Sequence, residues 1–224
     1  MISPRSPVFE VRVSGPLACF TRPELKVERV SYPVMTPSAA RGVLTAILWK
    51  PAIAWRIHRI RVLSDIRLIE FRRNEVNSKA VGPGAAIVAG GGAPSLLLAD
   101  EDRAQRNTVA LRDVDYVIEA SFALTDKAGP EDNLRKFVEM FERRLTKGQH
   151  FYQPYLGCRE FAATVTPATE APPPISQSKA LGVMLWDIDF QPSGNRPIFF
   201  RARLENGVLE VPEDPESTLD EEVA

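Results

Sequence analysis

The sequence predicts an α+β fold, in which an amino-terminal domain, residues 1–166, is followed by a small carboxy-terminal antiparallel β-sheet. Three observations support this prediction. Several short segments alternate apolar and polar residues, as half-buried strands do. Two longer segments repeat apolar residues at helical spacing. The proline-rich linker 167–178 then separates these elements from further segments with strand-like alternation.

The first strand and the first helix have clear local signals. Residues 9–13 alternate apolar and charged side chains, which predicts a strand. Thr36 can cap a helix whose first position is Pro37, where the missing amide hydrogen costs nothing because that amide has no partner inside the helix. The apolar stripe of this helix reaches Ile47, and Pro51 stops it.

Two further strands are predicted on either side of an insertion. Residues 53–63 and 111–124 both alternate apolar and polar side chains. Between them, residues 64–106 form a glycine-rich insertion with one short strand-like run, 66–71. Its glycines lack the sequence of a phosphate-binding loop, so we expect a mobile loop rather than a nucleotide site.

The second helix follows Asn133 and ends at Gly148, and a fourth strand is predicted within 158–165. The order strand, helix, strand, strand, helix, strand is that of ferredoxin-like domains, which RNA-recognition modules also use. Because this fold hosts unrelated activities, the order of elements does not assign a function.

The carboxy-terminal part, 179–212, is expected to form the small β-sheet. Three strand-like runs lie in it: 181–190, 197–204 and 208–211. Asn206 and Gly207 form a strong hairpin-turn signal between the last two runs. The remaining residues, 213–224, are acidic and contain prolines, so we expect a disordered tail.

Composition excludes several classes of protein. No stretch approaches the roughly 20 apolar residues of a membrane span, and the first seven residues lack the apolar core of a signal peptide. We therefore expect a cytoplasmic protein that does not bind membranes. Cys19 and Cys158 are expected in or near the core, without a disulfide or a zinc site. No carboxylate spacing resembles a metal site, and we expect no cofactor.

Charge leaves two interpretations open. The 28 basic residues almost balance the 29 acidic ones, but the acidic tail leaves the folded body with an excess of base. Arginines gather in three segments: 56–73, 103–112 and 135–159. Such clusters suit a surface that binds the phosphates of nucleic acid, although arginine runs also form ordinary solvated faces.

Long motifs connect the chain to a known family. The stretch Phe20–Gly42, with the sequence FTRPELKVERVSYPVMTPSAARG, resembles the amino-terminal signature of the CRISPR-associated Cas-five family, subtype d, of type I-C systems. Five more segments continue this similarity: Trp49–Ile53, Arg72–Val76, Gln105–Asn107, Leu111–Ala120 and Pro154–Phe161. The similarity covers nearly the whole chain, apart from the glycine-rich part of the insertion and the acidic tail.

The resemblance implies a protein that cuts CRISPR repeat RNA without a metal and then holds the 5′ handle of the guide RNA. The implied partners are this RNA, other subunits of a type I-C surveillance complex and, through the complex, target DNA. The implied reaction is attack by a ribose 2′-hydroxyl on the adjacent phosphate. It requires a proton acceptor, a cation at the phosphate and in-line geometry.

The catalytic residues of the family are only partly matched. The family has a Tyr or His at the end of the first helix and a Lys-His pair early in the second. These positions hold Leu48, Lys136 and Phe137, so only the lysine matches. His150, in the loop after the second helix, is the candidate substitute for proton transfer. The competing interpretation is a solvated loop histidine.

Candidate RNA contacts lie in two regions. Lys136, Arg143 and Lys147 recur at helical spacing on one side of the second helix. They precede Gly148, which we expect at the RNA backbone, and Tyr152, which could stack on a base or donate a hydrogen bond to a phosphate.

The second region is the irregular segment before the first helix, which offers Arg22, Lys26 and Arg29. The alternative for these three residues is a loop held by local ion pairs with Glu24 and Glu28.

Further expectations concern the placement of two tryptophans and one histidine. Trp49 and Trp55 are expected in the core, and His58 at the surface or facing a phosphate.

Two alternatives to a nuclease also stay open. One is a structural subunit that caps the 5′ handle, and the other is a ferredoxin-like module with no RNA role.

Overall fold

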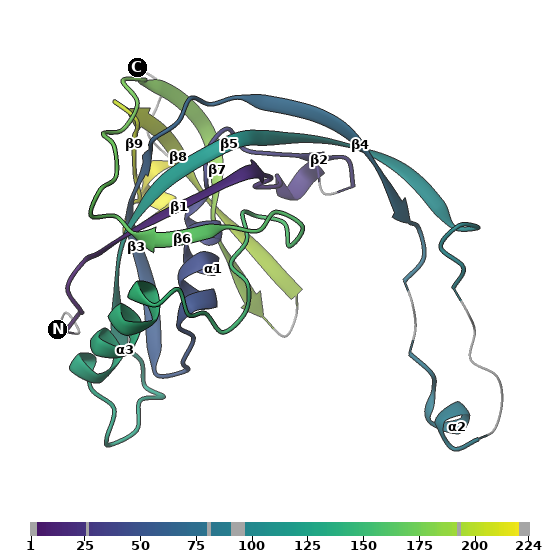
Figure 1. Cartoon of the computed structure of the whole chain (residues 1–224), viewed down its shortest axis with the longest axis horizontal. Coiled ribbons are helices and arrows are strands. Elements are labelled where there is room, and N and C mark those ends of the chain that lie inside the picture. Colours follow the sequence, from purple (N-terminus) through teal and green to yellow (C-terminus); the bar gives the residue numbers. More distant parts are fainter. Residues whose placement is uncertain (1–3, 26, 80–81, 91–96, 192–193, 220–224) are drawn as a thin grey trace.

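The computed structural model describes residues 4–25, 27–79, 82–90, 97–191 and 194–219. In these ranges one large sheet of nine strands dominates the molecule, with few helices beside it (Figure 1). Seven strands lie in the order β6-β1-β5-β3-β9-β8-β7, and β2 and β4 pair with β5 outside this path. All pairs are antiparallel except β2 with β5.

The strands are β1 (Phe9–Ala18), β2 (Arg29–Val30), β3 (Ile53–Val62), β4 (Leu68–Val76), β5 (Arg103–Leu124), β6 (Thr164–Pro167), β7 (Lys179–Gln191), β8 (Gly194–Glu205) and β9 (Val208–Glu210). The helices are α1 (Pro37–Ile47), α2 (Ala85–Val88) and α3 (Leu134–Thr146). No helix in the described ranges is long and apolar enough to cross a membrane.

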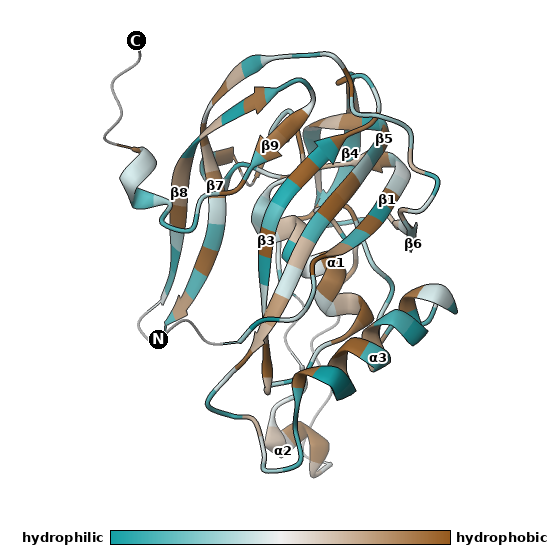
Figure 2. Ribbon diagram, turned by 90° about the vertical axis from the view of Figure 1, so that its left-hand side faces the viewer, coloured by the Kyte–Doolittle hydropathy of each residue, from teal (hydrophilic) through white to brown (hydrophobic). Residues whose placement is uncertain are grey.

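The local signals of the two long helices are confirmed. Thr36 caps α1 and its hydroxyl oxygen accepts a hydrogen bond from the amide of Ala39, 3.2 Å away, while Pro37 takes the first helical position. Asn133 caps α3 in the same way and accepts from the amide of Lys136 at 2.9 Å. In Figure 2 the hydrophilic turns of α3 lie on its outer side, and its apolar stripe faces the sheet.

Aromatic packing fixes the end of α1 against the sheet and α3. Trp55 on β3 packs edge-on against Phe122 on β5 and at a tilt against Phe141 on α3, with ring centroids 5.0 and 4.8 Å apart. Its indole N–H donates to the carbonyl oxygen of Leu48 at 3.2 Å. The prediction of a core role for Trp55 is therefore confirmed. Cys19 and Cys158 are also buried, as predicted.

The core prediction for Trp49 is wrong, because 56% of this residue is exposed. Leu48 leaves the helical conformation and is fully buried, so the next side chain points away from the core. His58 also differs from the prediction. It is half-buried and its Nε2 lies 2.8 Å from the hydroxyl of Ser121 on the neighbouring strand.

The described part of the glycine-rich insertion contains more regular structure than predicted. Strand β4 pairs along its whole length with the first part of β5, Arg103 to Leu111, and the two project as a long ribbon with α2 at its far end (Figure 1). We call β4, this part of β5 and α2 the arm. The expected strand 66–71 thus becomes β4, and β5 begins before the expected 111.

The carboxy-terminal strands join the main sheet instead of forming a separate one. Strand β9 pairs with β3 and so connects the β7–β8 hairpin to the rest. Asn206 and Gly207, with φ of 46° and 74°, form the predicted hairpin turn. The fourth predicted strand is shorter than expected, since only Thr164–Pro167 pairs with β1 and 158–163 is loop.

The described part of the acidic tail contains a short turn that contacts β8. Residues 216–218 form a 3₁₀ turn, and the hydroxyl of Thr218 accepts a hydrogen bond from the amide of Arg201 on β8 at 2.9 Å. This contact gives the tail a partner that composition does not reveal. Residues 220–224 lie outside the described ranges.

Candidate nucleic-acid interface

The loop that follows α3 is held in a defined conformation. Gly148 has a φ of 63°, which reverses the chain at the end of the helix and favours glycine. The amide of Gln149 then donates to the carbonyl oxygen of Arg144 at 2.8 Å, and the amide of Phe151 donates to that of Ala46 on α1 at 2.7 Å. These bonds place the loop against the end of α1.

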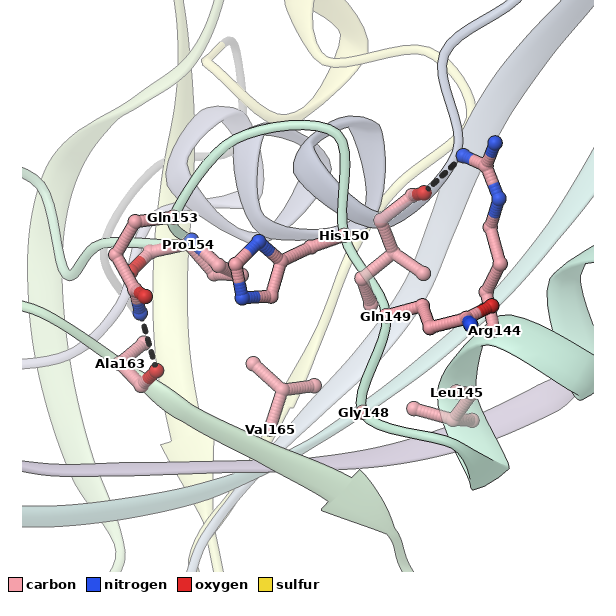
Figure 3. A pocket seen from close by; sticks show the side chains of 10 residues that line it. Arg144, Leu145, Gly148, Gln149, His150, Gln153, Pro154, Ala163 and Val165 are labelled. Carbon is pink, nitrogen blue, oxygen red and sulfur yellow. Dashed lines mark hydrogen bonds between the residues drawn. The ribbon is translucent and has the colours of Figure 1, made fainter.

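A pocket of about 130 Å³ lies beneath this loop. Its lining residues are Ile47, Arg144, Leu145, Gly148, Gln149, His150, Gln153, Pro154, Ala163 and Val165. Figure 3 shows the imidazole of His150 over the pocket, on the side of Gln153 and Pro154. The side-chain amide of Gln153 donates to the carbonyl oxygens of Pro154 and Ala163, at 3.2 and 3.1 Å.

His150 and Gly148 both line this pocket. His150 is exposed at its edge, so the imidazole is open to solvent and to a ligand. Phe151 and Tyr152 follow it as exposed aromatic residues with ring centroids 6.1 Å apart. Exposed rings next to cations are suited to stacking on unpaired bases.

Lys136, Arg143 and Lys147 are all exposed, and their spacing puts them on one side of α3 and its exit. We call these three residues the α3 basic face. In the described ranges no ion pair engages Arg143 or Lys147. Two strong cations on this face thus stay available for phosphates.

Lys136 differs from the other two residues because it has a carboxylate partner. Its ammonium lies 2.9 Å from Asp132 Oδ1. This hydrogen bond, together with one from the Gly129 amide, lowers the pKa of Asp132 below its ordinary value. The ammonium also lies 5.7 Å from the ring centroid of Phe137.

The structure does not bring Lys136 and His150 together. Lys136 is in the first turn of α3, and Lys147 follows its last turn about 16 Å further along the axis, at 1.5 Å per residue. His150 follows Lys147 in the chain, in the loop that turns back at Gly148, and lines a different pocket from Lys136. The two side chains therefore belong to different pockets.

The two unmatched family positions are apolar and buried. Leu48 is 0% exposed and Phe137 is 2% exposed. Phe137 packs in the main core, as its place on the apolar stripe predicted. Neither side chain can transfer a proton.

The residues predicted before α1 are mostly engaged by other groups. The guanidinium of Arg22 lies 4.6 Å from the ring centroid of Tyr32 and 3.8 Å from a carboxylate oxygen of Glu24. Arg29 pairs with Glu75 at 3.1 Å and with Glu160 at 3.2 Å. These contacts favour the ion-paired loop, although Arg29 pairs with other acids than Glu24 and Glu28. Lys26 lies outside the described residues.

Arg29 also donates to the thiol sulfur of Cys158 at 3.4 Å. Cys19, whose thiol is hydrogen-bonded to Cys158, lowers the pKa of Cys158 to about 6, and the charge of Arg29 acts in the same direction. The guanidinium of Arg29 is therefore paired with groups of the protein itself.

A second basic cluster has no signal in the sequence. Lys50 and Lys127 line a pocket of about 220 Å³ with Lys136 and Asp132. Lys50 follows α1, and Lys127 lies in the loop between β5 and α3. They are far apart in the chain, and no local signal predicts that these two loops meet.

Comparison with known proteins identifies the family. Residues 8–212 match the family model described as CRISPR-associated protein (Cas_Cas5), subtype Cas5d. The chain is 49% identical over 213 residues to the CRISPR pre-crRNA endoribonuclease Cas5d of Mannheimia succiniciproducens, covering 91% of this chain and 94% of the relative. It is 41% identical over 222 residues to the protein of that name from Thermus thermophilus, covering 91% of each.

Solved structures have the same fold. A crystal structure of a CRISPR-associated protein superimposes with a TM-score of 0.70 at 22% identity and covers 97% of both chains. A chain of a CRISPR RNA-guided surveillance complex gives a TM-score of 0.53 at 15% identity, with 95% of this chain and 98% of that chain covered. With the family model matching almost the whole chain, this protein belongs to the Cas5d family of CRISPR-associated proteins.

Proposed function

We propose that this chain binds the repeat-derived 5′ handle of guide RNA in a type I-C CRISPR surveillance complex and processes the precursor RNA by metal-independent cleavage. The observation that carries the proposal is the exposed α3 basic face, which leads to the loop of Gly148 and Tyr152. Relatives named as pre-crRNA endoribonucleases support the same substrate. The chain would act in the cytoplasm and reach target DNA through the complex.

In the proposed reaction the 2′-oxygen of a ribose bonds to the adjacent phosphorus and the bond from phosphorus to the 5′-oxygen breaks. The proton of the 2′-hydroxyl passes to an acceptor, and the leaving 5′-oxygen takes up a proton. We assign Lys136 the role of stabilising the negative charge of the phosphate while the 2′-oxygen attacks it. His150, at the other end of α3, can accept a proton only at a different position on the RNA.

A non-catalytic role is the second candidate, because one specific observation favours it. The positions of two family catalytic residues hold the buried apolar residues Leu48 and Phe137. A chain with this site can hold the 5′ handle while another nuclease makes the cut. Binding through the α3 basic face does not depend on these two positions.

Finer assignments of the fold are also part of the proposal. The antiparallel order β6-β1-β5-β3, with α1 and α3 between its strands in the sequence, supports a ferredoxin-like domain over residues 1–166. We propose that residues 179–212 form its carboxy-terminal β extension.

One experiment separates the two candidates. The purified chain is incubated with its own labelled repeat hairpin and a chelator, and the products are resolved on a denaturing gel. A fragment with a 2′,3′-cyclic phosphate end, lost in Lys136→Ala, supports cleavage. Tight binding without product supports the cap. If the wild-type chain does not bind the hairpin at low salt, both candidates are wrong.

A further inference from the structure

A groove with exposed aromatic walls lies between the end of α1 and the tip of the β7–β8 hairpin. It has a volume of about 480 Å³. Its lining residues are Arg41, Thr45, Leu48, Trp49, Lys50, Ile53, Ala54, Trp55, Asp187, Ile188, Asp189 and Phe190. Trp49 is 56% exposed and Phe190 is 68% exposed. Large rings left in water on one groove indicate a binding surface.

The charges of the groove are partly neutralised within the protein. Arg41 binds Asp187 through two parallel hydrogen bonds of 2.8 and 2.5 Å, so this pair adds little net charge. Asp189 accepts a hydrogen bond from the side-chain amide of Gln191 at 2.8 Å and stays on the wall as a carboxylate. Lys50 lies at the opposite side, on the segment that follows α1.

Lys50 also lines the neighbouring basic pocket. The charged residues that line that pocket are Lys50, Lys127, Lys136 and Asp132. Asp132 is bonded to Lys136, and no ion pair engages Lys50 or Lys127 in the part of the chain that the structure describes. The aromatic groove and the basic pocket are therefore adjacent, because Lys50 lines both.

We propose that the groove and the basic pocket together bind one unpaired nucleotide of RNA. The base stacks on Trp49 and Phe190, and its phosphate is held by Lys50, Lys127 and Lys136. The inference rests on the proposed function and deepens it, since it names the part of the RNA that this site takes. Flat aromatic rings stack on any base, and lysines pair with phosphate.

The excess of cations favours RNA over a protein partner as the occupant. A protein segment would use the apolar walls but has no general need for three lysines at one end. A nucleotide uses both parts of the site. Its base is a flat π-system that stacks on the aromatic rings, and its phosphate is an anion that pairs with the lysines. Docking of another subunit is therefore an outcome of the test.

The test compares single-stranded and paired RNA on the purified full chain. The probes are a 12-nucleotide oligouridine and a blunt RNA duplex. Trp49→Ala and Phe190→Ala are each expected to weaken oligouridine binding about tenfold or more and to leave duplex binding within about twofold. Trp49→Phe keeps most of the affinity, since it keeps a ring. Val8→Ala, at a residue that is also 56% exposed, changes neither.

The basic pocket is tested by salt dependence. Lys50→Ala and Lys127→Ala are each expected to reduce the slope of log affinity against log salt for oligouridine by about 0.7. Trp49→Ala changes affinity but not this slope. The difference separates the base contact from the phosphate contacts.

Several results overturn the inference. Unchanged oligouridine binding in Trp49→Ala and Phe190→Ala sinks it while leaving the proposed function intact, provided that the wild-type chain still binds its repeat hairpin. Equal loss of both RNA probes indicates a folding defect or a general contact and also contradicts it. If the variants keep RNA binding but lose another subunit of the complex, the groove is a protein-docking site. If the wild type binds no RNA, the proposed function itself is wrong.

Discussion

The guanidinium of Arg144 donates a hydrogen bond to the carbonyl oxygen of Ile47, 2.7 Å away, and so joins the end of α3 to the end of α1. Carbonyl oxygens in the last turn of a helix have no amide partner within it, so a cation is a favourable donor there. Both residues line the pocket beneath His150. The bond therefore positions the loop that we assign to RNA.

Replacing Arg144 with alanine is expected to lower the free energy of unfolding by about 2 kcal/mol, because a charge-assisted hydrogen bond in a half-buried place is lost. Chemical denaturation measures this change. Arg143→Ala is the matched control. Arg143 is exposed, so its replacement changes stability by less than about 0.5 kcal/mol. Equal destabilisation by the two variants would contradict the assignment.

The pair of Asp132 and Lys136 predicts a pH dependence. Lys136 and the Gly129 amide bind the ionised carboxylate, so the pKa of Asp132 lies below the ordinary value of 3.8. The stabilisation is present above pH 3.8 and is lost as the pH falls through the lowered pKa. In Lys136→Met the pKa of Asp132 should rise toward 3.8, as measured by NMR titration. A midpoint that stays where the wild type has it shows that Lys136 is not its partner.

Gly148 and Gly157 both have a left-handed φ, but we expect them to tolerate a side chain to different degrees. A Cβ on Gly157, with φ of 83°, would overlap the carbonyl of Cys19, whereas a Cβ on Gly148, with φ of 63°, would meet open space. Gly148→Ala should therefore cost about 1 kcal/mol of backbone strain. Gly157→Ala should cost clearly more, because the strand end before Cys19 must also move. Similar melting temperatures for the two variants would argue against this geometry.

Local signals predicted the elements that depend on neighbours in the sequence. Thr36 and Pro37 mark the start of α1, and Asn206 with Gly207 marks a tight hairpin, because caps and turns are set by a few adjacent residues. The apolar stripe of α3 likewise placed Phe137 in the core.

The arm and the groove could not be predicted in this way. Strand β4 alternates exposed and half-exposed residues and buries no face, so the hydrophobic alternation that marks a strand is weak. Trp49 looks like a core residue because tryptophan usually is one, and only the turn after Leu48 directs it outward. The separation of Lys136 from His150 depends on the length of α3. The positions of the two residues in the sequence did not show that they line different pockets.

The family resemblance supplied what local patterns do not, namely the expectation that Lys136 stands at a position used in cleavage. Its neighbours in space, Lys50 and Lys127, come from two loops that only the folded chain brings together.

Binding of RNA by the α3 basic face is tested by replacing Lys136, Arg143 and Lys147 together with alanine and measuring affinity for the repeat hairpin between about 50 and 200 mM salt. We predict weaker binding and a slope of log affinity against log salt that is smaller by about 2, because three phosphate contacts are lost. Arg135→Ala, on the same helix and paired with Glu139, should leave the slope unchanged. Wild-type affinity of the triple variant at every salt concentration would contradict the proposal.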